Sequence, residues 1–314
     1  MDGVSLIIIS ILPPFLLLGI GAFARKVNWL RVEADSSLSM VTVRILYPCF
    51  ILFHILDAQD LVITDDTMLT PLVGFFAILL GFILSWLVGK VFKIEPKAVK
   101  SFRFCSGIFN YGFIAIPVAH SIFGADIIVH IIFFNLGVEI AIWTVGILIL
   151  SQDKFSFKGI VNPPVIAVLV ALTLQSFGGA QVMPVYLFNV IQMLGQCSIP
   201  LGLLLIGGSF YDLMQNFGFS KNYRTEVAAL LTRNLLFPAC ILLILISTPF
   251  LNEAQCLKQV LVIQAAMPAG IFAVVIVGNY SEDKETAMRS IIATMVTGII
   301  TLPIWIGIGL MLIN

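Results

Sequence analysis

Ten apolar stretches follow one another along this chain of 314 residues. A transmembrane helix needs about 20 mostly apolar residues. The stretches cover 4–24, 36–57, 69–92, 101–123, 125–150, 162–178, 184–210, 225–249, 255–280 and 286–313. Only short polar links separate them, and 11% of the residues are charged, against roughly 25% in soluble domains. The pattern predicts an all-α polytopic membrane protein with ten transmembrane helices.

Positive charge alternates between the links. The odd-numbered links, with the helix ends beside them, hold 14 of the 17 Lys and Arg residues. The second link has no basic residue and carries four aspartates, Asp57, Asp60, Asp65 and Asp66. Because Lys and Arg gather on the cytoplasmic side, we expect a cell-membrane protein (inner membrane, in a Gram-negative cell) with both termini outside.

Matching residues divide the ten helices into two units of five. Four pairs occur in the same order, and the first three have offsets of 150 to 152 residues: Pro13 with Pro163, Pro48 with Pro200, Pro117 with Pro268, and Trp143 with Trp305. Because five is odd, the second unit must lie in the membrane upside down relative to the first, as in many transporters. We predict inverted five-helix repeats at 1–151 and 162–314, with a short cytoplasmic link at 152–161.

Pro117 and Pro268 lie in the middle of the fourth and ninth stretches. A proline inside a helix removes a hydrogen bond and clashes with the preceding turn, and in lipid such a break survives where it is buried in protein or lines a watery cavity. Two breaks at matched places indicate a transporter's binding site. The N-terminal ends of the second half-helices favour an anion such as a carboxylate. We predict that the two broken helices cross around a substrate.

Polar and small residues gather at these two breaks. The candidate substrate-binding residues are Ser106, Asn110, Tyr111, Gly112, Pro117, Gln264 and Pro268. For Asn110 and Gln264 two interpretations stay open: they bind the substrate, or they satisfy backbone groups that the breaks leave free. The two roles are compatible.

Three ionisable residues lie inside predicted helices, namely Arg44, Glu139 and Arg233. A charge within the membrane is costly and marks function by default, so all three are candidates for coupling or gating. We expect Glu139 to form a structural or gating ion pair with an arginine. The alternatives are that Glu139 binds a coupling cation or proton, or that it faces a watery vestibule.

Several other function classes find no support in the sequence. There is no catalytic constellation and no nucleotide-binding motif in a proper setting, and the five scattered cysteines lack metal-binding spacing. We therefore expect no enzyme, metal or cofactor, with Na⁺ or H⁺ considered only as a coupling ion. The net charge is zero, so the sequence lacks the excess of positive charge that is typical of nucleic-acid-binding proteins. A receptor without transport would need a signalling module outside the membrane, and none is seen.

Several runs resemble the auxin efflux carrier family. They are SGIFNYGFIAIP (106–117), NPPVIA (162–167), SIPLGLLLIGGS (198–209) and QAAMPAGIFAVVIVGNY (264–280), followed by TLPIW. This family includes plant auxin exporters and bacterial relatives described as malonate or malate permeases. The resemblance covers essentially the whole chain. It implies ten helices with two crossed broken ones, an architecture related to that of bile acid–sodium symporters. By position, Asn110 and Pro117 match the fourth-helix crossover, and Pro268 matches the ninth.

These observations predict a secondary transporter that moves small organic anions (carboxylates, auxin-like or dicarboxylate) by alternating access. The fifth link is only about ten residues long, so the long cytoplasmic loop of many plant exporters is absent. The alternative is a sodium- or proton-coupled symporter of the bile acid–sodium type that uses Glu139 in coupling. The expected partners are the substrate and membrane lipid, and a homodimer stays open.

Overall fold

All ten apolar stretches are helical in the computed structural model, which describes residues 3–58, 65–150, 162–215, 223–248, 254–280 and 283–313. Seven helices within these ranges are long and apolar enough to cross a membrane. The other three predicted stretches are a shorter apolar helix, Pro163–Ser176, and two interrupted ones. No strand longer than a single bridge occurs in the described ranges. The described part of the chain is therefore all-α, with the helix lengths and composition of a membrane protein. The predicted link at 152–161 lies outside the described residues.

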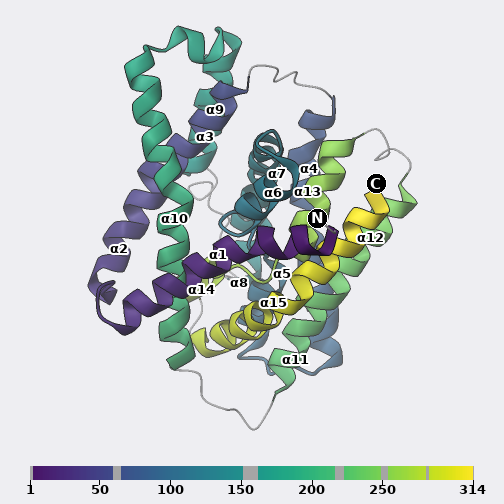
Figure 1. Ribbon diagram of the computed structural model, residues 1–314. Helices are drawn as coiled ribbons and strands as arrows, with labels where there is room; N and C mark the ends of the chain where they lie inside the picture. Colours follow the sequence, from purple (N-terminus) through teal and green to yellow (C-terminus); the bar gives the residue numbers. More distant parts are fainter. Residues whose placement is uncertain are drawn as a thin grey trace.

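One group of helices packs together on the left of Figure 1. It comprises α1 (Gly3–Lys26), α2 (Val32–Val41), the π-helical turn η1 (Thr42–Leu46), α3 (Tyr47–Asp57), α9 (Pro163–Ser176), the 3₁₀ turn η4 (Gly179–Val182) and α10 (Val185–Gln215). Its main contacts are α1 on α10, α3 on α9 and α3 on α10. At one end, Arg25 Nη2 lies 2.5 Å from Asp35 Oδ1 and Arg25 Nε lies 3.4 Å from Asp212 Oδ2, which ties α1, α2 and α10 together. We call this group the first bundle.

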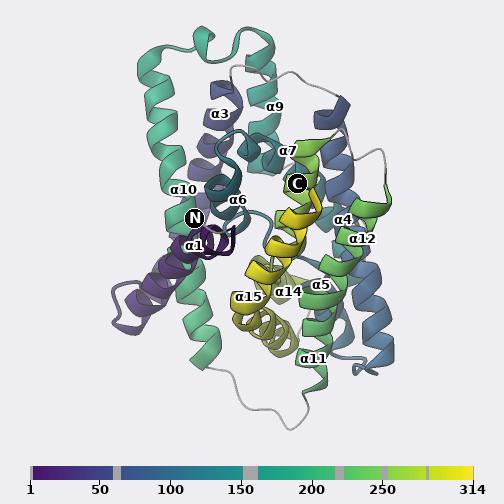
Figure 2. The ribbon, with the colours of Figure 1, turned by 45° about the vertical axis from the view of Figure 1, so that its right-hand side comes forward.

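The remaining helices form a second bundle, most of which is seen at the centre and right of Figures 1 and 2. Its members are α4 (Asp65–Val91), α5 (Val99–Gly107), α6 (Ala115–Phe123), α7 (Ile127–Ala141), η2 (Ile142–Gly146), α8 (Ile147–Leu150), α11 (Arg224–Leu230), η5 (Leu231–Leu236), α12 (Phe237–Ser247), α13 (Gln255–Ala266), α14 (Phe272–Tyr280) and α15 (Lys284–Ile313). Within it α4 packs on α7, and α15 packs on α11 and α13. The two bundles touch mainly where α1 meets α6 and α15.

Glycines allow the closest helix contacts inside each bundle. A Cβ atom added at Gly137 of α7 would lie 1.7 Å from the carbonyl oxygen of Pro71 on α4. In the first bundle, a Cβ atom at Gly21 of α1 would lie 2.2 Å from the carbonyl oxygen of Leu204 on α10. Small residues that let backbones approach are a general means of helix association in membranes. Each bundle is therefore held by backbone-to-backbone packing.

The fourth and ninth stretches are interrupted, and the two interruptions pair with each other. The first separates α5 from α6, and the second separates α13 from α14. One antiparallel bridge joins Phe109 to Ala269. The backbone N–H of Asn110 donates to the carbonyl of Pro268 (2.8 Å), and that of Gly270 donates to the carbonyl of Ile108 (3.1 Å). Each interruption thus supplies partners for backbone groups that apolar surroundings would leave unpaired.

The prolines mark these interruptions in two different ways. Pro268 lies inside the second interruption. Pro117 does not lie in the first one as expected, because α6 begins at Ala115 and Pro117 belongs to its first turn. A proline is tolerated there, since the first N–H groups of a helix have no partner within the helix. Its ring would still clash with the carbonyl of Phe113 in a continuous helix, which places the break just before it.

Candidate functional site

A cavity of about 300 Å³ lies where the two interrupted helices cross. Both interruptions line it, through residues 108–113 and 270–273. The second bundle also contributes Glu139, Ile142, Trp143, Val275 and Ile276, and the first bundle contributes Val43, Tyr47, Asn162, Pro164 and Ile206. Small-molecule sites begin at about this volume and are mostly apolar with a few polar groups. The cavity therefore has the size and lining of a site for a small molecule, and it lies between the bundles.

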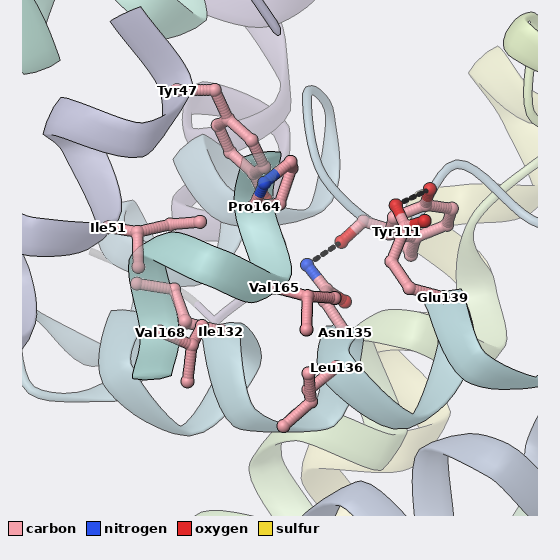
Figure 3. A pocket seen from close by; sticks show the side chains of 10 residues that line it. All are labelled: Tyr47, Ile51, Tyr111, Ile132, Asn135, Leu136, Glu139, Pro164, Val165 and Val168. Atoms are coloured by element: carbon pink, nitrogen blue, oxygen red, sulfur yellow. Dashed lines mark hydrogen bonds between the residues drawn. The ribbon is translucent and has the colours of Figure 1, made fainter. Parts of the chain in front are cut away.

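Glu139 is the one charged residue among the described residues that line this cavity. Its Oε1 accepts a hydrogen bond from Tyr111 Oη (2.6 Å), and its Oε2 accepts from Trp143 Nε1 (2.9 Å) and Asn162 Nδ2 (3.0 Å). Figure 3 shows the Tyr111 ring and the Glu139 carboxylate facing each other. All three donors are uncharged. Hydrogen bonds to an ionised acceptor are roughly twice as strong as neutral ones, so they offset part of the cost of keeping a carboxylate here.

The expected ion pair between Glu139 and an arginine is wrong for the described part of the chain. No ion pair is found there for Glu139. Arg44 is exposed on η1. Arg233 is 1% exposed, and its Nη2 donates to the carbonyl of Ala265 (3.1 Å). The carboxylate is satisfied by three local donors instead, so it needs no distant cation for its hydrogen bonds.

Two side-chain amides hold the backbone of the first interruption in place. Asn135 Nδ2 and Gln264 Nε2 both donate to the carbonyl of Tyr111, each at 3.1 Å, and Gln264 Nε2 also lies 3.4 Å from Asn135 Oδ1. Asn135 borders a smaller cavity of about 10 Å³, drawn in Figure 3, which has room for about one water molecule. For Gln264 this geometry favours the interpretation that it satisfies a freed backbone group.

Residues 6–159 and 150–306 match the family model described as membrane transport protein. The chain belongs to this family, that of the auxin efflux carriers. This confirms the resemblance in the sequence motifs. An uncharacterized transporter of Methanocaldococcus jannaschii is 24% identical over an alignment of 322 positions, covering 100% of this chain and 99% of the relative. An uncharacterized transporter of Methanothermobacter thermautotrophicus is 21% identical over 303, covering 94% and 96%.

In this membrane transport protein the predicted site residues fall into two groups. Asn110, Tyr111, Gly112 and Glu139 line the cavity. The other candidates are not among its lining residues, namely Ser106, Pro117, Gln264, Pro268, Arg44 and Arg233. Apart from Gly112, the cavity-lining group supplies polar side chains, whereas Gln264 and Pro268 hold the crossing through Tyr111 and Asn110.

Trp143 and Asn162 also line the cavity with polar groups, but the sequence did not predict them as site residues. They entered the sequence analysis only through the repeat match of Trp143 and the family resemblance of the run at 162–167. Trp143 follows Glu139 by four residues, which places both on one helix face. Asn162 is the N-cap of α9, and its Oδ1 accepts from the N–H of Val165 (3.0 Å). An Asn before two prolines is a recognisable helix start, but nothing local to that motif indicates that its amide reaches Glu139.

Proposed function

We propose that this protein is a secondary transporter that carries small organic anions across the cell membrane by alternating access. The observation that carries the proposal is the position of the cavity. It is lined by both interrupted helices and by both bundles, so a movement of one bundle against the other would change its access to either side. Membership of a membrane transport family supports the same conclusion.

We further propose that ten segments cross the membrane as two inverted repeats with both termini outside. The seven long apolar helices, the short α9 and the two interrupted helices together supply ten segments. The distribution of Lys and Arg supports the orientation. The antiparallel bridge between the interruptions supports opposite directions for the fourth and ninth segments.

Two features favour an anion as the substrate. The second half of the ninth segment, α14, begins at Phe272, and residues 270–273 line the cavity. The beginning of a helix carries partial positive charge and N–H groups without helical partners. The cavity also holds the donors Tyr111, Trp143, Asn110 and Asn162. A carboxylate is the common ligand for such a set.

Replacing Asn110 with alanine tests this assignment. Asn110 lines the cavity and is 6% exposed, so Asn110→Ala should lower uptake by about tenfold or more, because a lost hydrogen bond to a charged group costs about 1.5–3 kcal/mol. The measurement is uptake of labelled malonate, malate and indole-3-acetate into proteoliposomes. The control is Gln215→Ala, at the exposed end of α10. Wild-type uptake by well-folded Asn110→Ala protein would reject the site.

A second candidate function is a sodium- or proton-coupled symporter that uses Glu139. It is favoured by the observation that the carboxylate in the cavity is met only by uncharged donors among the described residues. An anionic substrate would have to enter beside this charge, and like charges disfavour each other. A proton or Na⁺ on Glu139 would remove that repulsion.

Coupling predicts a specific defect in Glu139→Gln, which is permanently neutral. This variant should lose accumulation driven by a pH or Na⁺ gradient but keep exchange of labelled for unlabelled substrate, since exchange needs no net ion movement. Both modes are measured in the same proteoliposomes, first with a Na⁺ gradient at fixed pH and then with a pH gradient. Accumulation that ignores both gradients in the wild type would exclude the symporter.

A further inference from the structure

Three donors from separate parts of the chain converge on one carboxylate. Tyr111 belongs to the first interruption, Trp143 to η2, and Asn162 to the start of α9. They lie 2.6 to 3.0 Å from the oxygens of Glu139. Such a cluster is built to hold a carboxylate, whichever molecule carries it. Glu139 is only half-buried, because the cavity of about 300 Å³ lies directly beside it.

The donors available to an anion at this place are side chains, because the backbone N–H groups at the start of α9 are absent or already bound. The beginning of α9 carries the positive end of a helix dipole, but Pro163 and Pro164 have no N–H, and the N–H of Val165 is bound by Asn162 Oδ1. An anion next to α9 must therefore use the amide of Asn162 with the hydroxyl of Tyr111 and the indole of Trp143. Glu139 occupies all three at once.

We propose that these three donors form a carboxylate-binding site of the transporter, and that Glu139 fills it as a built-in ligand which a carboxylate of the substrate displaces. This inference rests on the proposed function as a carrier of organic acids. Two carboxylates side by side on these three donors are disfavoured, since their like charges repel and the hydroxyl of Tyr111 and the indole of Trp143 have one hydrogen each. Glu139 then swings into the adjoining cavity.

Displacement of Glu139 also breaks a bond between the bundles. Glu139 lies on α7 of the second bundle, whereas Asn162 begins α9 of the first. Their hydrogen bond (3.0 Å) therefore ties the bundles together as long as the Glu139 carboxylate occupies the site. When an external carboxylate takes the donors, Glu139 releases Asn162. Substrate binding is thereby linked to the freedom of one bundle to move against the other.

The test removes the built-in ligand and supplies a small external one. Glu139→Ala leaves the three donors vacant, so acetate should bind to the purified variant with an affinity at least about tenfold higher than to the wild type, from the loss of a charged competitor. The signal is the fluorescence of Trp143, which donates to the site. Glu139→Gln is the matched comparison, because it removes the charge while its amide still fills the space, so its gain in acetate binding should be clearly smaller than that of Glu139→Ala. Adding Trp143→Phe to Glu139→Ala should remove the signal.

A second readout guards against a variant that folds poorly. A ligand that binds only the folded state raises the melting temperature as its concentration exceeds Kd, so acetate should stabilise Glu139→Ala, or Glu139→Ser, more than the wild type. Equal acetate binding by wild type and both well-folded variants would overturn the proposal. The carrier function is judged separately, by uptake. If the variants bind acetate more tightly but the wild type takes up no acid, the proposed site stands and the proposed transport function is rejected. If the wild type takes up acids but the variants show no gain in acetate binding, only the proposed site is rejected.

Discussion

Transport should fall by more than about tenfold when Ser10→Cys and Ser121→Cys are combined and the two thiols are oxidised. Ser121 Oγ donates to Ser10 Oγ at 3.0 Å. Ser10 lies on α1 of the first bundle and Ser121 on α6 of the second. A disulfide needs Cβ atoms about 3.5–4.5 Å apart, which side chains in hydrogen-bond contact approach. Alternating access requires the bundles to slide, and this bond would prevent it.

The experiment needs a background without the native cysteines, which are Cys49, Cys105, Cys197, Cys240 and Cys256. Uptake is compared in the double variant before oxidation, after oxidation and after a reductant, and each single variant receives the same treatments. Recovery on reduction would show that the protein stayed intact. If protein whose cross-link is verified by mass spectrometry transports as well as its reduced form, the bundles do not move past each other at α1 and α6.

Replacing Arg233 with methionine is expected to lower transport by at least about tenfold while the protein stays folded. The guanidinium lies 3.6 Å from the ring centroid of Phe237 and 5.0 Å from that of Phe109, and it donates to Ala265. Phe109 belongs to the first interruption, and Ala265 is the next-to-last residue of α13, which the second interruption follows. Arg233 thus holds both in place. The cation–π contacts and the hydrogen bond contribute about 2 and 1.5–3 kcal/mol, and removing the buried charge recovers several kcal/mol of desolvation.

Because these opposing contributions are of similar size, the melting temperature of Arg233→Met should change by only a few degrees. The control is Arg44→Met. Arg44 also lies in a π-helical turn before an aromatic residue and a proline, but it is exposed, so its replacement should leave uptake near the wild-type rate. Melting curves and uptake are measured on the same preparations. Normal uptake by Arg233→Met would show that the crossing keeps its geometry without this side chain.

The positions of the helices followed from the sequence, whereas the surroundings of their polar residues did not. Hydropathy alone predicts the spans, because lipid accepts only backbone that is paired within its own segment or in a closed barrel. Hydropathy does not distinguish the lipid-exposed face of a helix from its buried face, since lipid is as apolar as the protein interior. Arg44 and Arg233 therefore looked alike in sequence, although one is exposed and the other buried.

The environment of Glu139 was out of reach for a related reason. Its three donors are at positions 111, 143 and 162, and only Trp143 is a neighbour along the same helix. The other two depend on where an interruption ends and where α9 begins. The sequence motifs indicated both features separately, as a run before Pro117 and as an Asn followed by two prolines. Their meeting at one carboxylate is a property of the tertiary structure.

The bridge between the interruptions has a consequence for how affinity differs between the two membrane faces. Its two backbone hydrogen bonds have no replacement in apolar surroundings, where each unpaired group costs several kcal/mol, so the pair should stay closed through a whole transport cycle. The part of the cavity lining that the bridge holds in place then keeps one shape in every state. If the protein works by alternating access as proposed, a difference in substrate affinity between the inward and outward states must come from lining residues outside this bridge, such as Glu139 and the residues of the first bundle.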